Sequence, residues 1–471
     1  EPIPPEFGQD ELLGLIAIAQ MELGNEGAAA ERLTEMIQTS TTLEPDSMVV
    51  ARPKVITYSV DLAKRLASEA LVVDVLTAAL ATVPDQAEVH HQTSIWEAIA
   101  AVSIELDDHQ ASATLLDAVT HSVRQELDQE SFVYPETLKT IASRYIELAA
   151  VSDTGDYERR AADLLEEAIA ANVAITYEQY SHFSPLDPEW GNEDIHRRDY
   201  QRTQNGLLRA MAGIITDLKP TLASSLLTLM ETKVNTLATP RAQQEGLLTV
   251  ASAYQRLDQP EATAASLKRA LATMSQIENT ENQGQGLSLI AQSYAEIKMP
   301  DLAIHLLQQA TALIPNYRNS DTQLLTLSFV LRTYSTLSEM APELPESKTI
   351  ALRETALEEL DAIADLIQTL PDQFTQVSLQ LPLAKAYGQW GERQQLGTIL
   401  SAVLDEARQV SVQTTQNILF TYAAREYWTI GEEQTAEQIL AEALVATVEN
   451  GDSSTRQISL PQLALTYQKW G

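Results

Sequence analysis

Residues 245–271, EGLLTVASAYQRLDQPEATAASLKRAL, are followed by a second copy of the same unit at 285–311, QGLSLIAQSYAEIKMPDLAIHLLQQAT. The two copies align without a gap when Tyr254 is placed on Tyr294, forty residues later. Apolar residues before Tyr254 recur at spacings of three and four, which predicts one apolar face on a helix. After a short break, Pro260 suits the first turn of a second helix. Each copy is therefore expected to be a helical hairpin.

A similar spacing continues along most of the chain. Forty-residue steps link Ile214, Tyr254, Tyr294 and Tyr334, and again Tyr387, Tyr427 and Tyr467; Ala63 and Ser103 are also forty apart, and Gln20 and Tyr145 fit the series with slightly longer steps. A leucine thirteen residues after this position recurs as Leu33, Leu76, Leu116, Leu227, Leu267, Leu307, Leu400 and Leu440. A small residue three before it recurs as Ala17, Ala100, Ala142, Ala251, Ala291, Ala384, Ala424 and Ala464, and it would let two helices approach closely. One period repeated this often predicts an array of stacked hairpins.

This spacing resembles that of tetratricopeptide repeats (TPRs). Besides the small residue and the tyrosine, the shared features include a small residue nine after the tyrosine, as at Ala303 and Ala436, and a proline twenty-one after the repeat position, as at Pro84 and Pro315. The family's usual unit is about thirty-four residues, so a period of forty implies longer helices or turns. The resemblance implies an all-α fold, an α-solenoid of about ten helical hairpins plus a terminal helix, wound as a right-handed superhelix.

One stretch breaks the repeat. Residues 175–203, ITYEQYSHFSPLDPEWGNEDIHRRDYQRT, show no helical period and bring several aromatic residues close together in sequence. The expected organisation is therefore repeats 1–4 in 1–173, an irregular aromatic insertion in 174–204, and repeats 5–10 with the terminal helix in 205–471. Long loops are often functional, and rings beside arginines are typical of binding hot spots. Candidate ligand-binding residues here are Tyr177, Tyr180, Phe183, Trp190, Arg197 and Arg198. The alternative is that the rings cover a seam between two halves of the array.

The charge balance limits the classes of partner. The chain has 31 Lys and Arg residues against 66 Asp and Glu residues, which gives a formal net charge of −35. Nucleic acid is not expected as a partner, since phosphate binding needs clustered cations, and an anionic membrane surface is disfavoured for the same reason. The sequence has no apolar run long enough to span a bilayer.

Cysteine is absent from the sequence, which excludes disulfides and thiolate metal sites. The sequence begins Glu1-Pro2-Ile3-Pro4-Pro5 without a methionine, a start typical either of processing or of an arbitrary boundary. Together these features favour a periplasmic or extracellular location and leave a cytoplasmic one open.

No catalytic signature is found in the sequence. It contains no nucleophile elbow, no glycine-rich phosphate loop, and no pair of histidines at a ligand spacing on a helix. His90 and His91 lie near Glu88, and His109 follows two aspartates, but neither cluster has the one-face spacing of a paired ligand motif. We expect these to be solvated loop residues, with no metal and no cofactor.

Side chains next to the repeat tyrosine are the candidate partner-binding residues, because in the family that the spacing resembles they face the concave groove. Reading those positions gives Arg256, Gln292, Arg332, Lys385, Arg425 and Trp428. Arg332, Lys385 and Arg425 occupy the same place in three successive repeats, and such cations would hold the carboxylates of an acidic peptide. The alternative is that each base pairs with a glutamate of its own neighbouring helix, such as Glu296 or Glu426, and contributes little.

The function expected from these features is a non-catalytic scaffold, assembly factor or adaptor that binds a protein or peptide in its concave groove. The alternative is an exported structural or small-ligand-binding component in which the aromatic insertion holds a molecule such as a sugar. A third possibility is an enzyme in which the insertion builds a site on the array.

Overall fold

The computed structural model describes residues 9–42, 51–86, 88–152, 155–183, 193–409, 413–450 and 453–470. Within these ranges all regular secondary structure is helical, and no strand is present. The chain is therefore all-α, as the repeat pattern predicts. It folds as two compact units, Glu1–Gln259 (unit 1) and Pro260–Gly471 (unit 2).

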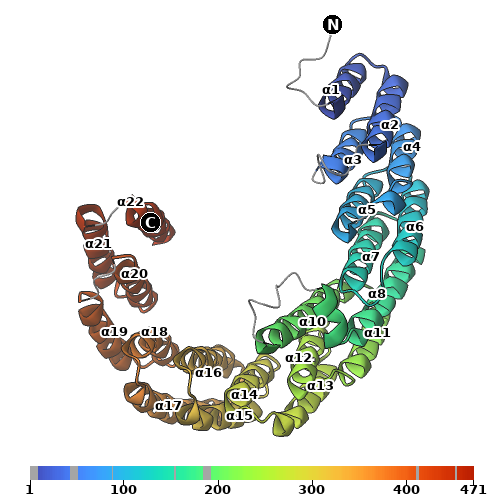
Figure 1. Ribbon diagram of the computed structural model, residues 1–471. Helices are drawn as coiled ribbons and strands as arrows, with labels where there is room; N and C mark the ends of the chain where they lie inside the picture. Colours follow the sequence, from blue (N-terminus) through green and yellow to red (C-terminus); the bar gives the residue numbers. More distant parts are fainter. Residues whose placement is uncertain are drawn as a thin grey trace. The chain divides into compact units, whose positions relative to one another are not determined.

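Unit 1 contains twelve α-helices in its described part. They are α1 (Gln9–Glu22), α2 (Glu26–Thr42), α3 (Ala51–Ala63), α4 (Glu69–Leu80), α5 (Val89–Ser103), α6 (His109–Glu126), α7 (Val133–Val151), α8 (Asp156–Ala174), α9 (Tyr177–Phe183), α10 (Glu193–Ile215), α11 (Pro220–Val234) and α12 (Pro240–Arg256). Figure 1 shows them in two layers, with α1, α3, α5, α7, α10 and α12 inside and α2, α4, α6, α8 and α11 outside.

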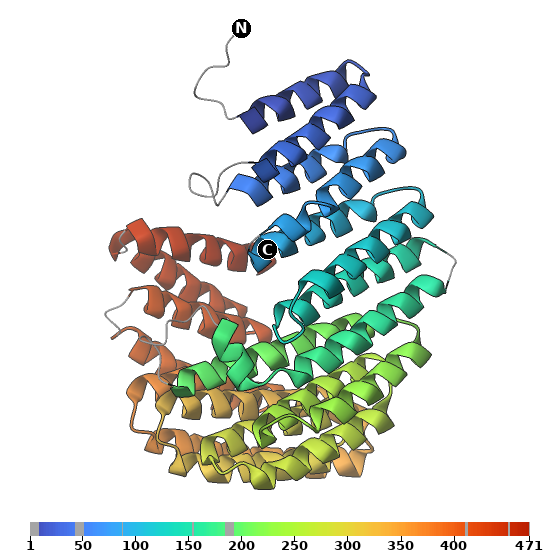
Figure 2. The same cartoon turned by 45° about the vertical axis from the view of Figure 1, so that its right-hand side comes forward.

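Unit 2 continues the same arrangement within itself. Its described helices are α13 (Pro260–Thr273), α14 (Thr280–Glu296), α15 (Pro300–Leu313), α16 (Ser320–Met340), α17 (Glu346–Thr369), α18 (Gln373–Gln389), α19 (Arg393–Ala407), α20 (Gln413–Thr429), α21 (Glu433–Asn450) and α22 (Ser453–Trp470). The inner layer is α14, α16, α18, α20 and α22, and the outer layer is α13, α15, α17, α19 and α21 (Figures 1 and 2).

Taken in chain order, the described helices form ten pairs and a final helix, with α9 as an addition. Within each unit the two helices of a pair pack on one another, and each inner helix also packs on inner helices before and after it. The sixth pair, α12 and α13, is divided between the two units. The prediction of an α-solenoid built from about ten hairpins and a terminal helix is confirmed, while the handedness of its superhelix stays a prediction.

The leucines that the repeat pattern assigns to the core are buried in every copy. Each has no exposed surface: Leu33, Leu76, Leu116, Leu227, Leu267, Leu307, Leu400 and Leu440. The small residues three before the repeat position are equally buried from Ala17 to Ala424. Ala464 of α22 is the exception, since it is exposed and the adjacent Leu463 is buried instead. No second helix follows α22 in the described chain, so this alanine has no hairpin partner to pack against.

A tyrosine hydroxyl links successive repeats. Tyr387 donates a hydrogen bond from its hydroxyl to Asp361 Oδ1 at 2.6 Å, twenty-six residues earlier on the outer helix of the preceding repeat. The same twenty-six-residue step joins the hydroxyls of Tyr254 and Thr228 at 3.1 Å and those of Tyr427 and Ser401 at 3.3 Å. The repeat tyrosine therefore fixes both the core of its own hairpin and the contact with the previous one.

The turn inside five of the hairpins shares one backbone feature. The fourth residue after the repeat position has a positive φ there, at Gly24, Asp258, Lys298, Gly391 and Gly431. Glycine adopts this left-handed conformation without steric cost. Asp258 and Lys298 adopt it at φ values of 55° and 62° and carry the cost that a Cβ imposes there.

The segment 174–204 is not irregular throughout. Helix α9 covers Tyr177–Phe183, and α10 begins at Glu193, so its first twelve residues lie inside the segment expected to be irregular. Tyr200 is buried and lies seven residues before the buried Leu207, at a helical spacing that is hidden among charged residues. The division of the chain at this segment stays a proposal. The boundary between the two compact units lies elsewhere in the sequence, between Gln259 and Pro260.

Candidate functional site

The inner layer of unit 2 presents three of the predicted cations. Arg332 on α16, Lys385 on α18 and Arg425 on α20 each lie two residues before a buried repeat tyrosine, and all three are exposed. Because the tyrosine points into the hairpin, a residue two positions earlier points away from the core. Helix geometry thus places the three cations on the exposed side of their helices.

Two of these cations line one pocket. A cavity of about 300 Å³ lies between α18 and α20, lined by Ser378, Leu381, Pro382, Lys385, Tyr422, Arg425 and Glu426. Helices α18 and α20 pack less closely than α16 and α18 do, which leaves room for it. Of the predicted residues, Lys385 and Arg425 are brought together here, whereas Arg332 lies outside this pocket.

A proline helps to shape the pocket. Pro382 lies in the interior of α18, and because proline has no backbone N–H, the helix hydrogen bond to the carbonyl of Ser378 cannot form from this position. Both residues line the cavity. The pocket therefore offers a backbone acceptor and a hydroxyl on one side, next to the apolar ring of the proline.

Charge in the pocket is mixed. Burial raises the pKa of the half-buried Glu426 carboxyl, and the nearby Lys385 and Arg425 oppose this effect. The Arg425 guanidinium also lies 5.3 Å from the centroid of the exposed Tyr422 ring, at cation–π distance. Two cations facing one carboxylate leave a net positive pocket that can accept an anionic group, with an aromatic and an aliphatic wall around it.

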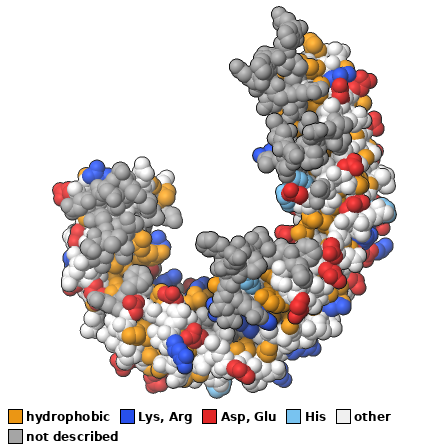
Figure 3. Space-filling view, viewed as in Figure 1, with side chains coloured by type: hydrophobic (Ala, Val, Ile, Leu, Met, Phe, Trp, Pro, Cys, Tyr) orange, Lys and Arg blue, Asp and Glu red, His pale blue; other side chains and the backbone are white. Residues whose placement is uncertain are grey.

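The arginine and ring pair of α20 is repeated on α16. Arg332 lies 4.9 Å from the centroid of Phe329, three residues earlier, as Arg425 does with Tyr422. Leu325 and Ile418, four residues before these rings, are 45% and 40% exposed. Figure 3 shows hydrophobic and basic side chains near one another on the inner surface of this unit. Sequence reasoning missed these apolar positions, although their fixed offset from the repeat tyrosine was available as a signal.

The remaining predicted groove residues lie elsewhere. Gln292 donates from Nε2 to Glu296 Oε1 at 3.0 Å on its own helix, as the pairing alternative describes. Trp428 is partly buried and packs against the hydrophobic core of unit 2. Arg256 belongs to unit 1, where it is exposed on α12 and its Nη1 lies close to Gly213 of α10. None of these three lines the pocket between α18 and α20.

The described rings of the aromatic segment pack on one another. Tyr180 and Tyr200 are buried, with centroids 5.7 Å apart, and both contact Phe132 from the loop before α7. Tyr177 packs on Tyr200 and carries Arg197 at 4.5 Å over its ring, while Arg198 is exposed. These contacts join α9 and α10 to the rest of unit 1. The side chain of Phe183 and the whole of Trp190 lie outside the described residues.

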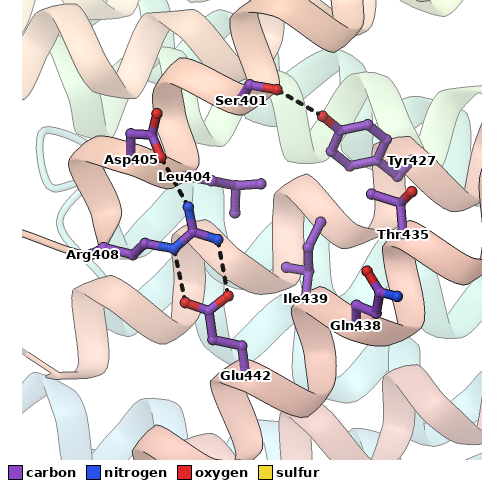
Figure 4. Close-up of a pocket in the computed structure, with 9 residues that line it drawn as sticks. All are labelled: Ser401, Leu404, Asp405, Arg408, Tyr427, Thr435, Gln438, Ile439 and Glu442. Atoms are coloured by element: carbon purple, nitrogen blue, oxygen red, sulfur yellow. Dashed lines mark hydrogen bonds and ion pairs between the residues drawn. The ribbon is translucent and has the colours of Figure 1, made fainter.

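A second cavity, of about 310 Å³, lies on the outer layer between α19 and α21 (Figure 4). Arg408 spans it with two hydrogen bonds to Glu442, at 2.9 and 3.0 Å, and a third to Asp405. These bonds lower the pKa of Glu442 despite its partial burial. Since the arginine is already satisfied by two carboxylates, this cavity is a bridge between outer helices and offers no free cation to a ligand.

The histidine cluster lies at the N-terminus of α5. His90 and His91 place their Nε2 atoms 3.2 and 3.8 Å from Glu88 Oε2, and burial lowers the pKa of His91, with His90 adding to the effect. Their ligand atoms lie within 4.8 Å of one another. Glu88 and His90 are exposed, and an exposed group of this kind is also the arrangement expected for solvated residues.

None of the helices in the described ranges is both long and apolar enough to cross a bilayer.

No family model and no curated protein matches the sequence. Among solved structures, a protein of the kinesin light chain type from Podosopora anserina, with nearly identical TPR-like repeats, is 18% identical, covers 45% of this chain and 100% of its own, and has a TM-score of 0.31. A circular tandem repeat protein is 15% identical over 98% of this chain and 94% of its own, with a TM-score of 0.32. A monomeric IFIT1 mutant with Gppp-AAAA is 15% identical over 97% of this chain and 86% of its own, with a TM-score of 0.31.

The class of this protein follows from its own architecture. Paired helices in two layers, a recurring forty-residue step and a buried alanine, tyrosine and leucine at fixed offsets define a helical-repeat solenoid. Its repeat spacing is similar to that of TPR proteins, with a longer unit.

Proposed function

We propose that this chain is a non-catalytic scaffold that binds a segment of another protein along the inner layer of unit 2. The observation that carries the proposal is the pocket between α18 and α20, where Lys385, Arg425 and Tyr422 converge. An acidic side chain of the partner would enter this pocket, because a net positive site with few competing carboxylates favours an anion. Arg332, the exposed Leu325 and the partly exposed Phe329 of α16 would extend the contact.

Isolated exposed apolar residues are normal on a protein surface, but a repeated pair is informative. Leu325 with Phe329 and Ile418 with Tyr422 place an aliphatic and an aromatic side chain at the same two positions of alternate inner helices. Between them α18 contributes Pro382 and Leu381. Such an arrangement suits a partner segment that alternates acidic and apolar residues.

The pocket can be tested by affinity capture from the native source. The intact chain is used as bait beside the variant Lys385→Ala/Arg425→Ala and a matched control, Lys348→Ala/Arg393→Ala. The control removes the same charge from exposed positions on α17 and α19 of the same unit. A partner captured by the wild type and the control but lost with the pocket variant would support the proposal.

The same partner retained by the pocket variant would overturn it. Adding Arg332→Ala to the pocket variant then measures how far the contact extends along the layer. The alternative function, a small ligand such as a sugar held by residues 175–203, stays a prediction. Tyr200 contacts both Tyr177 and Tyr180, and Tyr180 and Tyr200 are buried.

A further inference from the structure

Helix α10 of unit 1 carries a row of arginines on one side. With about 100° of turn per residue, Arg198, Arg202 and Arg209 point within about 40° of one another. Tyr200 and Leu207 point the opposite way and are buried. The Tyr200 hydroxyl donates to the carbonyl of Ile175 at 2.7 Å. This bond holds the first turns of α10 in place and so fixes the position of the arginine row.

The three arginines are free of intramolecular partners. Each is exposed, and within the described ranges no hydrogen bond or ion pair reaches Arg198, Arg202 or Arg209. By contrast, seven other arginines of the described ranges, among them Arg124 and Arg408, form ion pairs with carboxylates. Basic side chains are visible on the inner surface beside α10 in Figure 3.

The facing helix α12 does not neutralise the row. Its Glu245 carboxylate is already engaged at both oxygens, by Arg241 Nε at 2.9 Å and by Asn205 Nδ2 at 2.8 Å. Arg256 of the same helix adds a further exposed cation against Gly213 of α10. The surface formed by α10 and α12 therefore has an excess of positive charge.

A buried acceptor lies within the row. Asn205 is only 3% exposed and points to the same side as the arginines. Asn205 Nδ2 donates a hydrogen bond to Glu245, whereas Asn205 Oδ1 is buried without a hydrogen-bond partner. A buried acceptor left unpaired is costly, so a ligand that donates a hydrogen bond at this point would gain from satisfying it.

We propose that the arginine row of α10, defined as Arg198, Arg202 and Arg209 with Asn205 between them, is a second docking site, and that it binds an acidic peptide segment in extended conformation. Arg198 and Arg202 are separated by about 6 Å along the helix axis and Arg198 and Arg209 by about 16 Å. An extended peptide rises about 3.3 Å per residue, so side chains on one of its faces recur about every 6.6 Å. Carboxylates two residues apart match the first pair, and a third on the same face, four residues after the first and about 13 Å along the peptide, comes within reach of the long Arg209 side chain.

The unpaired Asn205 oxygen favours a peptide over a nucleic acid. A peptide backbone supplies N–H donors at every residue, whereas a phosphate backbone supplies only acceptors. The chain's net charge of −35 also repels a long polyanion more strongly than a short segment. This inference concerns unit 1 and is independent of the pocket proposed in unit 2, so either can fail alone.

The test measures the affinity of a short fluorescein-labelled peptide with glutamates at alternate positions. It uses the full chain with Lys385→Ala/Arg425→Ala, so that the pocket of unit 2 cannot contribute. In that background, Arg198→Ala/Arg202→Ala/Arg209→Ala is compared with Arg159→Ala/Lys348→Ala/Arg393→Ala, which removes three exposed cations from outer helices. Far-UV circular dichroism checks that all variants are folded.

We expect the row variant to raise the Kd about ten-fold, as three exposed charge pairs at about two-fold each would give, and the control to change it by less than about two-fold. Replacing glutamate by glutamine in the peptide should abolish the difference. Methylation of one backbone nitrogen, scanned along the peptide, should weaken binding at a single position opposite Asn205. Equal affinity of the row variant and the control would overturn the proposal, as would a deoxythymidine oligonucleotide that binds through the same arginines more tightly than the peptide.

Discussion

The tyrosine link between repeats allows a paired stability test in unit 2. Tyr387 and Tyr334 occupy equivalent repeat positions, and their rings are almost completely buried. The Tyr387 hydroxyl donates to Asp361 at 2.6 Å, whereas the Tyr334 hydroxyl is buried without a partner. The reason is local, because Gln308, twenty-six residues before Tyr334, instead donates to Glu359 at 2.9 Å.

The two tyrosine to phenylalanine changes should therefore act in opposite directions. A hydrogen bond to a charged group contributes about 1.5–3 kcal/mol, and since Asp361 is exposed and can turn to water, Tyr387→Phe should cost about 1 kcal/mol. An unpaired buried polar group costs about 1–3 kcal/mol, so Tyr334→Phe should stabilise unit 2 by about 1 kcal/mol. The expected difference between the variants is about 2 kcal/mol.

Urea unfolding followed by circular dichroism measures this difference. Both changes lie in unit 2, so where the two units unfold in separate transitions only one midpoint should move. Asp361→Asn is the companion variant: it weakens the acceptor without touching the ring, and should reproduce part of the loss seen in Tyr387→Phe. A Tyr334→Phe variant destabilised as much as Tyr387→Phe would refute the reasoning, since it would mean that the Tyr334 hydroxyl is satisfied.

Three further outcomes follow from unit 2. Gly284→Ala should lower its stability by about 2 kcal/mol or more, because the added Cβ would lie 1.6 Å from the Tyr317 hydroxyl oxygen; an unchanged urea midpoint would contradict this packing. Glu442→Gln should cost at most about 1 kcal/mol at pH 7, the range of a partly exposed ion pair. Arg408 lowers the pKa of Glu442 below 4.5, so the wild type should be more stable than Glu442→Gln above this pH and lose that extra stability as the pH falls through the folded pKa. The same stability difference between the two proteins at neutral and at strongly acidic pH would argue against this. Pro382→Ala should stabilise α18 by about 1–3 kcal/mol, because a helix-interior proline costs about 3 kcal/mol. It should also weaken partner capture, because it removes the apolar proline ring and lets the alanine N–H bond to the Ser378 carbonyl. Stabilisation without loss of capture would show that Pro382 does not contribute to binding in the pocket.

Much of the fold could be predicted from the sequence because the same residue types recur at the same offsets in many copies of the repeat. The leucine thirteen residues after the repeat position is fully buried in all eight copies that have it. The turn residue four after the repeat position has a positive φ in five copies, including those where it is Asp258 or Lys298. Each instance is weak by itself, but errors in one copy are corrected by the others. The helical part of 193–203 could not be predicted in this way, because no second copy of it exists in the chain.

The candidate sites were less predictable for a related reason. The repeat tyrosine gave the positions of Lys385 and Arg425, but not that α18 and α20 separate enough to form a pocket between them. That opening depends on packing between helices from different hairpins, which no local pattern encodes. Asn205 was missed because its importance lies in one unpaired oxygen, and this depends on Glu245 forty residues away.

Both proposed binding surfaces lie where the inner layer departs from the repeat rule. Pro382 interrupts the hydrogen bonds of α18, and α10 is extended by turns that lie outside the repeat period and are held by Tyr200. Residues that obey the rule, such as the buried leucines, contact the core and have no surface to offer a partner. In a fold whose stability is distributed over many similar units, one unit can depart from the rule while its neighbours maintain the core. Changes at rule positions should therefore alter stability with little effect on binding specificity, and changes at Pro382 or the α10 arginines should do the reverse.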